Sequence, residues 1–479
     1  MKNVSTARIT VFLSVFLLFG HPAFSEPTPS PASSVTEETN SFRPEVSKKI
    51  DDAATKMLSE SGVPSASIAV VKDRKLAYTK AYGLADIASH RPATTSMIYS
   101  IGSISKQFTA ASMLLLAEEG KLSLDDPVRR WLPDLTRANE ITIGQVLSMT
   151  SGYQDCWPQD YVMASMMKPA SPEEILKGWA QKPLDFEPGT KWQYSNTNYV
   201  AAGVIVERLS GMSVLDFLHR RVFDPLGMKT VFDCDSSALP PGAPTRYHRY
   251  GLGPARPAPK EGRGWLFAAG ELAMTASDLA KWDISMIDQA IMKPRSYREM
   301  ERAELLKNGA STQYGLGVGV SLINDRRVLA HGGEVSGFTA QNAVYPDDRA
   351  AVIVLTNMDA NRAAENLLNK IVEIIFAPTG NGNSLAKAKA ILVGLQKGKI
   401  DRSLFTDNAN AYFDKQCLHD LASSLAPLGS PSDFELVSEG LRGGMTAHRY
   451  RAKFQKKTLE VSTYAMPDGK LEQYIVSAE

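Results

Sequence analysis

The sequence predicts an α/β (α+β) fold: an antiparallel sheet flanked by helices, followed by a smaller α+β module. Short apolar, β-branched runs occur near the start of a first domain and again near its end, and the stretch between them has helical patterning. The runs are Ser67 to Val71, Leu76 to Tyr82, Gly315 to Ile323, Arg327 to His331 and Ala350 to Thr356. We therefore expect a sheet built from both ends of this domain around a helical middle.

Two helices are predicted most clearly. Apolar residues recur at helical spacing from Val46 to Leu58, with Pro44 suited to a first turn and Gly62 to a C-terminal cap. The second helix runs from Lys106 to Glu119. The turn residues Lys72-Asp73-Arg74-Lys75 separate the first two strand-like runs, which indicates a hairpin.

Composition and charge exclude several classes of protein. The 479 residues include 53 Lys plus Arg and 52 Asp plus Glu, a net charge of +1, which disfavours a nucleic-acid binder that relies on a general positive field. The three cysteines, Cys156, Cys234 and Cys417, show no zinc-binding spacing. Cys156 and Cys234 lie in loop-like stretches, so an exported protein could pair them in a disulfide, whereas Cys417 has a core-like position.

The N-terminus predicts export. Lys2 and Arg8 precede an apolar run that is too short to span a bilayer, and Ala23-Phe24-Ser25 offers the small residues of a cleavage site. We expect residues 1–25 to be a signal peptide and residues 26–43 to be a flexible leader rich in Pro, Ser, Thr and Glu. The mature chain would then have no integral membrane segment and would be periplasmic or secreted.

The remaining chain divides at a cluster of turn formers that begins at Pro378. We predict one large domain over residues 44–377, a linker over 378–387 and a small α+β accessory domain over 388–479. In the accessory domain, helices are expected at Leu385 to Gln396 and Asn408 to Leu425. Strands are expected at Phe434 to Leu441, Met445 to Phe454, Thr458 to Met466 and Leu471 to Val476.

Ser103 and Lys106 form the first candidate for chemistry. Residues three apart on a helix share a face, so the Ser103 hydroxyl and the Lys106 amine can meet. A serine becomes a useful nucleophile when a desolvated lysine or a nearby phenolate takes its proton. The structural alternative is that Ser103 caps the helix and Lys106 is solvated. The tetrapeptide Ser-x-x-Lys is common in long chains, so alone it is weak evidence of catalysis.

Two further segments carry candidate residues. Tyr194 and Asn196 follow a turn-rich stretch and precede a helix predicted from Tyr199 to Leu209, which places both residues on a loop. A tyrosine near a lysine could relay a proton, and an Asn amide could orient that lysine. His331 and Gly333 end a strand-like run, where glycines let backbone N–H groups approach a ligand. The structural alternative for Tyr194 and Asn196 is a buried tyrosine followed by an Asx turn. The alternative for His331 and Gly333 is a simple turn.

Taken in order, Ser103-x-x-Lys106, Tyr194-x-Asn196 and His331-x-Gly333 resemble the three motifs of the penicillin-recognising serine hydrolases. The resemblance is to the branch of class C β-lactamases, D-alanyl-D-alanine carboxypeptidase, D-aminopeptidases and esterases, and covers about Pro44 to Phe376. It implies a β-lactamase/transpeptidase-like fold, a sheet with an all-helical lobe. It also implies an acyl-enzyme mechanism with no cofactor and no metal.

The resemblance also implies roles for individual residues. Ser103 would attack a carbonyl, Lys106 and Tyr194 would manage its proton, and Asn196 would align them. His331 and Gly333 would border the substrate, and the backbone N–H groups of Ser103 and Glu334 would hold the oxyanion. A neutral His331 stands where class C β-lactamases have lysine, which weakens the site for a drug carboxylate. Two more departures are Met149, which replaces a usual histidine, and Glu271, which replaces a usual glycine and could narrow the cleft.

The leading hypothesis is therefore an exported hydrolase of D-amino-acid peptides or small esters. Its partners would be small-molecule or peptide substrates, for example derived from peptidoglycan, with no nucleic acid. The alternatives are a β-lactamase and a non-catalytic cell-envelope binding protein. In the accessory domain, basic residues alternate with apolar ones from Arg449 to Lys453. This favours a solvated sheet face over a surface that touches an anionic polymer or caps the active-site cleft.

Overall fold

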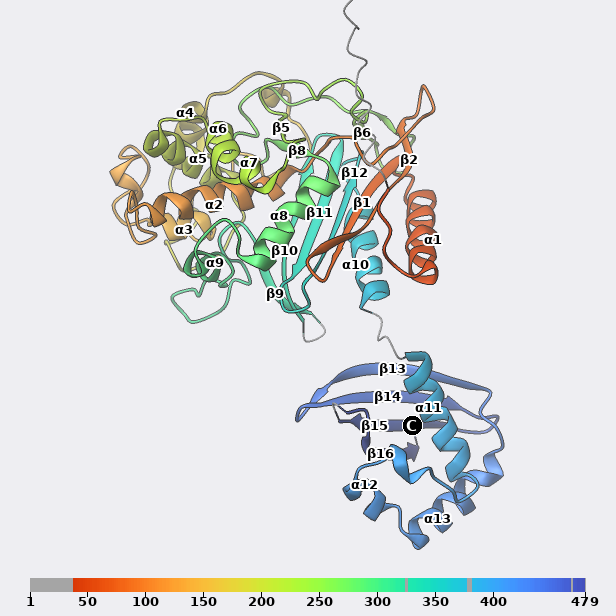
Figure 1. The fold of residues 1–479 in the computed structure, drawn as a ribbon. Helices are drawn as coiled ribbons and strands as arrows, with labels where there is room; N and C mark the ends of the chain where they lie inside the picture. The colour runs from red at the N-terminus through yellow and green to blue at the C-terminus, as the bar shows by residue number, and fades with distance from the viewer. Residues whose placement is uncertain (1–37, 324–325, 377–380, 467, 479) are drawn as a thin grey trace, which may run out of the picture. The chain divides into compact units, whose positions relative to one another are not determined.

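The computed structural model describes residues 38–323, 326–376, 381–466 and 468–478. Its largest sheet has seven antiparallel strands in the order β3-β2-β1-β12-β11-β10-β9 (Figure 1). Their bounds are β1 Ser65–Lys72, β2 Lys75–Asp86, β3 Arg91–Pro92, β9 Gly319–Ile323, β10 Arg326–Val335, β11 Phe338–Tyr345 and β12 Ala350–Thr356. The first and last strands of the domain meet where β1 pairs with β12, so the predicted sheet from both chain ends is confirmed.

Both faces of this sheet are covered, which explains its unbroken apolar strands. Alternate residues of β12 point to opposite sides: Ile353 packs toward α8 (Ala276–Asp288) and the helical lobe, whereas Val352 and Val354 pack under α1 (Pro44–Ser61) and α10 (Ala363–Ile375). α1 ends at Gly62 in the left-handed conformation, as the sequence predicts. The predicted helix and hairpin at the start of the domain are both confirmed.

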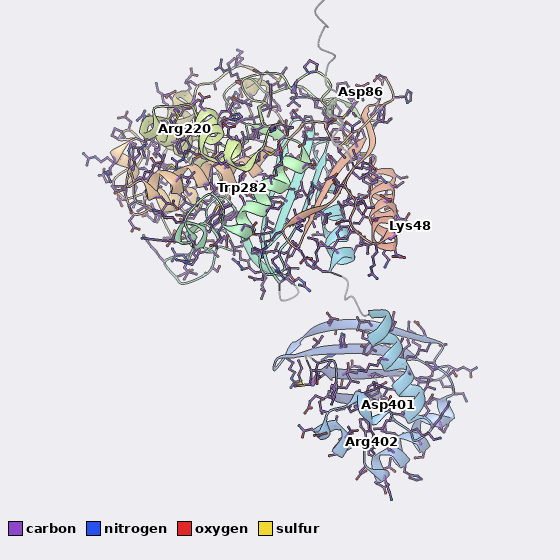
Figure 2. All side chains as sticks on the ribbon, viewed as in Figure 1. Lys48, Asp86, Arg220, Trp282, Asp401 and Arg402 are labelled. Carbon is purple, nitrogen blue, oxygen red and sulfur yellow. The ribbon has the colours of Figure 1, made fainter. Side chains whose placement is uncertain are left out.

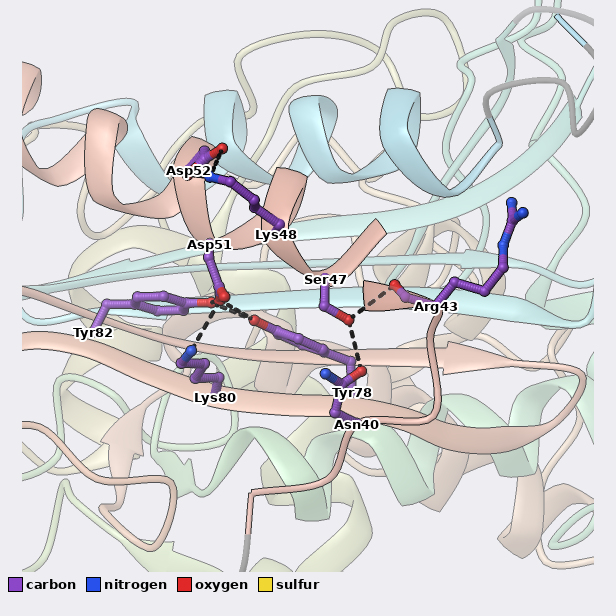
Figure 3. A network of polar contacts seen from close by, with 9 residues as sticks. All are labelled: Asn40, Arg43, Ser47, Lys48, Asp51, Asp52, Tyr78, Lys80 and Tyr82. Atoms are coloured by element: carbon purple, nitrogen blue, oxygen red, sulfur yellow. Dashed lines mark hydrogen bonds and ion pairs between the residues drawn. The ribbon is translucent and has the colours of Figure 1, made fainter. Parts of the chain in front are cut away.

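A network of polar contacts fastens α1 to β2 (Figure 3). The Asp51 carboxylate accepts hydrogen bonds from the hydroxyls of Tyr78 at 2.7 Å and Tyr82 at 2.6 Å, and lies 3.0 Å from the Lys80 amine. The tyrosine and lysine side chains all come from β2, so one carboxylate holds three neighbouring strand residues. These contacts lower the pKa of Asp51 although its partial burial opposes the shift.

The helical middle of the chain forms a lobe beside the sheet (Figure 1). Its helices are α2 Ser105–Glu118, α3 Ile143–Leu147, α4 Pro172–Ile175, α5 Asn196–Ser210, α6 Val214–Leu218, α7 Asp224–Leu226 and α9 Pro294–Met300. Short strands accompany them: β4 Tyr99–Ser100, β5 Phe232–Asp233 and β8 Leu272–Met274 in the order β4-β8-β5, and the pair β6 Tyr247–His248 with β7 Arg256–Pro257. Nearly every residue of α2 is buried, which makes it the central helix of the lobe.

Lobe and sheet meet around Trp282 of α8, which is labelled in Figure 2. Its ring lies 4.6 Å, centroid to centroid, from that of Phe108 on α2, and its indole N–H donates to Gln107 at 2.8 Å. Gln107 and the Asp283 carboxylate both bond to Asn342 of β11. This buried polar network fixes α2, the helix that carries Lys106, against the sheet.

The structure adds β11 and the short strands β3 to β8 to the predicted elements, and it moves the start of α5. β11 was not predicted, because polar residues such as Thr339, Gln341 and Asn342 interrupt its apolar pattern; Asn342 is nevertheless fully buried with its amide bonded. α5 begins at Asn196, three residues before the predicted start, so Asn196 lies in the first turn of a helix and not on a loop.

The C-terminal residues form a second core. A four-stranded antiparallel sheet in the order β13-β14-β15-β16 packs with three helices around Phe413, Tyr450 and Val461. The elements are α11 Asn381–Leu395, α12 Asp407–Tyr412, α13 Lys415–Leu425, β13 Asp433–Arg442, β14 Met445–Lys453, β15 Thr458–Ala465 and β16 Leu471–Ala478. α11 starts at Asn381, so most of the predicted linker is helical, and the helix predicted over 408–425 is broken in two.

The predicted disulfide is not formed. Cys156 and Cys234 are buried and free, each within the apolar core of the lobe, and Cys417 is half-buried against the C-terminal core. Within the described ranges, no helix is both long and apolar enough to cross a bilayer. The predicted signal peptide and most of the predicted leader lie outside the described residues.

Candidate active site

The nucleophile candidate and its lysine lie where a short 3₁₀ turn (Gly102–Ile104) runs into α2. The Lys106 amine lies 3.0 Å from the Ser103 hydroxyl, 2.8 Å from the side-chain oxygen of Asn196 and 2.8 Å from the backbone oxygen of Ala269. The predicted meeting of Ser103 and Lys106 is therefore found, together with Asn196. The amine has three acceptors, one for each of its three N–H groups when it is protonated.

Lys106 is suited to exchange a proton near neutral pH. Its side chain is fully buried, and desolvation lowers the pKa of its amine to about 7, although the charge of Asp155 raises it. A lysine with a pKa of about 7 is neutral in a large fraction of molecules at physiological pH, so it can accept the Ser103 proton.

Tyr194 lies against this pair as a neutral phenol. The Lys106 amine lies 4.9 Å from the centre of the Tyr194 ring. Burial raises the pKa of the phenol well above its usual value, and a hydrogen bond with Ser103 offsets this shift only in part. Of the two proton acceptors that the sequence offers for Ser103, a lysine and a phenolate, desolvation favours the lysine, because it keeps the Tyr194 phenol protonated. Tyr194 can still relay a proton.

The third motif brings the strand backbone to Ser103. A Cβ on Gly102 would lie 2.7 Å from the Glu334 nitrogen, and a Cβ on Gly333 would lie 1.8 Å from the Ile101 oxygen and 3.2 Å from the Ser103 nitrogen. Only glycines permit this approach of β10 to the turn that carries Ser103. The two predicted oxyanion donors, the N–H groups of Ser103 and Glu334, thus belong to backbone segments in direct contact.

His331 lines the site as a neutral imidazole. Its Nδ1 lies 2.5 Å from the Gly332 oxygen and its Nε2 lies 3.0 Å from the Tyr314 hydroxyl. Nδ1 therefore carries the proton, and Nε2 accepts from Tyr314. Burial and the charge of Lys106 lower the pKa of His331 to about 4, so the ring is neutral at pH 7, as expected from the ordinary pKa of a histidine.

These elements border a cavity of about 650 Å³. Ser103, Tyr194, Asn196 and His331 line it, with the 155–162 loop on one wall and the start of α10 on another. Its charged lining residues are Asp155, Asp160, Glu334, Asp359, Arg362 and Glu365. Lining oxygens are plentiful, but no group of three or more His, Cys, Asp or Glu side chains in the described part of the chain is arranged to hold a metal ion.

Sequence reasoning missed two residues of the site. Asp155 accepts hydrogen bonds from both the backbone and side-chain N–H groups of Asn196, and Tyr314 fixes the tautomer of His331. Neither lies in a motif that suggests chemistry. Asp155 follows Gly152, whose φ of +86° marks a sharp turn, and that turn is the one sequence signal near it.

Neither Met149 nor Glu271 lines the cavity at Ser103. Met149 is buried, and its sulfur accepts from the Ser195 N–H at 3.2 Å, so it packs behind the Tyr194 segment. Glu271 lines a separate cavity of about 600 Å³, behind the segment 264–271, and not the cavity at Ser103. The expectation that Glu271 narrows the cleft is wrong, because its side chain points to the other side of this segment.

Fold and site together define a serine hydrolase of the β-lactamase/transpeptidase class. A family model described as Beta-lactamase matches residues 50–373, more than half of the chain. The chain belongs to this family, as its motifs imply, and is a serine hydrolase related to penicillin-binding proteins and D-aminopeptidases.

The relatives are distant in sequence. Penicillin-binding protein 4* of Bacillus subtilis is 28% identical over 62% of this chain and 69% of its own length. The D-aminopeptidase of Brucella anthropi is 27% identical over 64% of this chain and 59% of its own length, so the chain matches about three fifths of that enzyme.

Solved structures show the same fold. The D-amino acid amidase of Ochrobactrum anthropi, complexed with D-phenylalanine, superposes with a TM-score of 0.62 at 22% identity, covering 69% of this chain and 99% of the amidase. An octameric penicillin-binding protein homologue from Pyrococcus abyssi covers 90% of this chain and 99% of its own, with a TM-score of 0.63 at 20% identity. That share exceeds what residues 1–387 could supply, so the match includes part of the C-terminal module.

Proposed function

We propose that this protein is an exported hydrolase that cleaves D-aminoacyl amides and peptides, or the corresponding small esters, through an acyl-enzyme on Ser103. The observation that carries the proposal is the contact of Ser103 with a buried Lys106 whose pKa is about 7. The names of the relatives, D-aminopeptidase and D-amino acid amidase, support the substrate class. Export rests on the predicted signal peptide alone.

The proposed steps follow from the contacts. Ser103 Oγ forms a bond to the substrate carbonyl carbon while its proton passes to Lys106, and the oxyanion accepts from the N–H groups of Ser103 and Glu334. The carbon–nitrogen bond then breaks, and the leaving amine takes the proton that Lys106 returns through the Tyr194 hydroxyl. Water attacks the resulting ester by the same route in reverse, which releases the acid and restores Ser103.

The charges of the cavity favour a substrate with a free ammonium over one with a carboxylate. Among the described residues, five carboxylates and one arginine, Arg362, line the cavity. Arg362 forms a two-point contact with Glu365 at 2.9 Å. His331 is neutral. Partial burial raises the pKa of Glu334, and the charges of Asp359 and Asp160 raise it further, so a cation there would relieve repulsion.

This balance of charges supports D-aminopeptidase or amidase activity over the alternatives. A D-alanyl-D-alanine carboxypeptidase and a β-lactamase both meet a substrate carboxylate, for which the described lining offers no unpaired cation. A non-catalytic binding protein would not need a desolvated lysine in contact with Ser103, because burying that amine is unfavourable in a merely structural role.

Three p-nitroanilides test the proposal, since they share one scissile bond: D-alanine with a free amine, with an acetyl group and with a succinyl group. We expect kcat/KM to fall in that order, and Ser103→Ala to abolish turnover. Glu365→Gln should release Arg362 and raise kcat/KM for the succinyl compound, whereas Asp134→Asn, on a loop outside the cavity, should leave all three unchanged. Preference for the succinyl compound, or faster hydrolysis of nitrocefin, would support the β-lactamase alternative instead.

A further inference from the structure

Asp155 holds Asn196 at two points. The first carboxylate oxygen of Asp155 accepts from the Asn196 backbone N–H at 2.8 Å and from its side-chain amide at 3.2 Å, while the second lies 3.5 Å from the same amide nitrogen. The first oxygen also accepts from the Trp157 N–H at 3.1 Å, which holds the carboxylate in its own loop. The amide nitrogen of Asn196 is thereby committed to Asp155.

This contact decides which atom of the amide faces the lysine. Because the nitrogen points to Asp155, the side-chain oxygen of Asn196 points to the Lys106 amine, 2.8 Å away. The Ala269 oxygen is the second permanent acceptor. In the neutral amine these two oxygens take both N–H groups, so the remaining tetrahedral position, the lone pair, is directed at the Ser103 hydroxyl 3.0 Å away.

A reversed amide would place N–H groups against Lys106. These N–H groups would donate to the lone pair of the amine and turn it away from Ser103. One N–H group of the amine would also lose its acceptor, because an N–H group of the amide cannot accept a hydrogen bond. We infer that Asp155 is a positioning residue, whose carboxylate acts through the Asn196 amide to aim the lone pair of Lys106 at the Ser103 hydroxyl. The inference rests on the proposed roles of Ser103 and Lys106.

Asp155 also acts on the lysine through its charge. The groups that face Lys106 besides Ser103 and Asn196 are Cys156, His331 and the rings of Tyr194 and Tyr199, at 4.9 and 5.6 Å. Burial raises the pKa of the Cys156 thiol to about 12, and His331 and both phenols are neutral at pH 7. The charge of Asp155 raises the pKa of the amine, against the lowering by desolvation.

Two substitutions separate the orienting effect from the charge. Asp155→Asn keeps a side-chain oxygen for the Asn196 N–H groups but removes the charge, whereas Asp155→Ala removes both. A fluorophosphonate probe reports on Ser103 without turnover: the Ser103 oxygen bonds to phosphorus, fluoride leaves and the hydroxyl proton passes to Lys106. The rate of labelling between pH 5 and 10 should rise with an apparent pKa of about 7 in the unaltered protein.

For Asp155→Asn we expect this apparent pKa to fall by about one unit, with the limiting rate at high pH nearly kept. For Asp155→Ala we expect the limiting rate to fall about 10- to 100-fold, since the lone pair is no longer directed. Asp185→Asn is the matched control: it removes an exposed carboxylate that bonds to Gln193, and it should change neither quantity.

The outcomes separate the inference from the proposed function. No labelling of the unaltered protein at any pH overturns both. Labelling that is lost in Ser103→Ala but unchanged in rate and pH dependence in both Asp155 variants overturns the inference alone. Because Asp155 also caps the first turn of α5, all labelling rates are compared at a temperature at which thermal unfolding shows Asp155→Ala to be folded. Asp155→Ala then tests the orienting effect and Asp155→Asn the charge.

Discussion

The hydrolase domain and the C-terminal module differ in where their ionisable side chains lie. In the hydrolase domain Lys106, Asp283 and Glu271 are buried, and desolvation moves the pKa of each toward the neutral form. In the C-terminal module the strand cations lie on the outer face of the sheet: Lys453 is 3.1 Å from Asp433, and Arg451 is 3.4 Å from Glu435. The pKa of Lys453 is raised by its acidic partners, toward the charged form.

This difference indicates where chemistry resides. A buried charge costs free energy and persists where it serves a purpose, whereas an exposed ion pair costs little and contributes little. Of the buried groups of the hydrolase domain, Lys106 contacts Ser103 and Asp283 belongs to the network that fixes α2, whereas Glu271 lines the separate cavity. The outer face of the C-terminal sheet has the paired charges of a solvated surface, which agrees with the prediction from the alternation of Arg449 to Lys453.

The largest effect is expected at Lys106. Lys106→Met leaves an unbranched side chain one atom shorter and removes the base, so the labelling rate of Ser103 should fall about 100- to 10,000-fold. The rate is measured with the fluorophosphonate probe at pH 8. Lys121→Met, an exposed lysine beyond the end of the same helix, is the control and should label normally. A fall of less than tenfold at Lys106 would mean that another base accepts the proton.

The next effect concerns stability. Burial raises the pKa of Asp283 from 3.8 to about 8, and one of its carboxylate oxygens has no hydrogen-bond partner. A raised pKa means that folding disfavours the charged carboxylate, so stability is lost as pH rises from about 4 toward 8. Asp283→Asn should therefore stabilise the hydrolase domain by roughly 3 kcal/mol at pH 8 and by much less at pH 5.

Urea unfolding followed by tryptophan fluorescence measures this difference, because all six tryptophans lie before residue 283 and none in the C-terminal module. Asp288→Asn, at the exposed end of α8, is the control and should show no such pH dependence. Equal stability of Asp283→Asn and the unaltered protein at both pH values would show that water or a counter-charge compensates Asp283.

A smaller effect is expected at Asp51, which is charged but shared among three partners (Figure 3). Asp51→Ala removes the acceptor that the Tyr78 and Tyr82 hydroxyls share, although the two hydroxyls can still bond to each other. It should destabilise the domain by about 1 kcal/mol, a value reduced by solvent screening. Asp52→Ala, on the next position of α1 and paired only with exposed Lys48, is the matched control. Urea unfolding of both variants at pH 7 measures the difference, and equal effects would contradict the network.

The comparison also explains what could be predicted from the sequence. Ser103, Lys106, Tyr194, Asn196 and His331 occur in local motifs, and the apolar pattern of β1 and β12 reveals the sheet that joins them. What could not be predicted depends on contacts between distant segments.

Asp155 lies 41 positions from Asn196, and Asn342 is satisfied by Gln107, 235 positions away. The strand that contains Asn342 was missed for this reason, since its buried polar side chain is acceptable only with that partner. The neutrality of Tyr194 was likewise unpredictable, because it depends on burial that the sequence does not reveal.

The smallest effect is expected in the C-terminal module. Lys453→Gln removes a cation whose partners Asp433 and Glu435 remain hydrated, so the melting temperature of the module should change by less than about 1 °C. Val461→Ala, on the neighbouring strand but fully buried, should lower it by several degrees, since it opens a cavity in the core. Far-UV circular dichroism follows both cores and tryptophan fluorescence only the first, so a change confined to circular dichroism belongs to the module. If Lys453→Gln destabilised the module as much as Val461→Ala, the exposed ion pairs of the strand cations would contribute to stability. The contrast between buried charges in one core and exposed, weakly contributing ion pairs in the other would then be wrong.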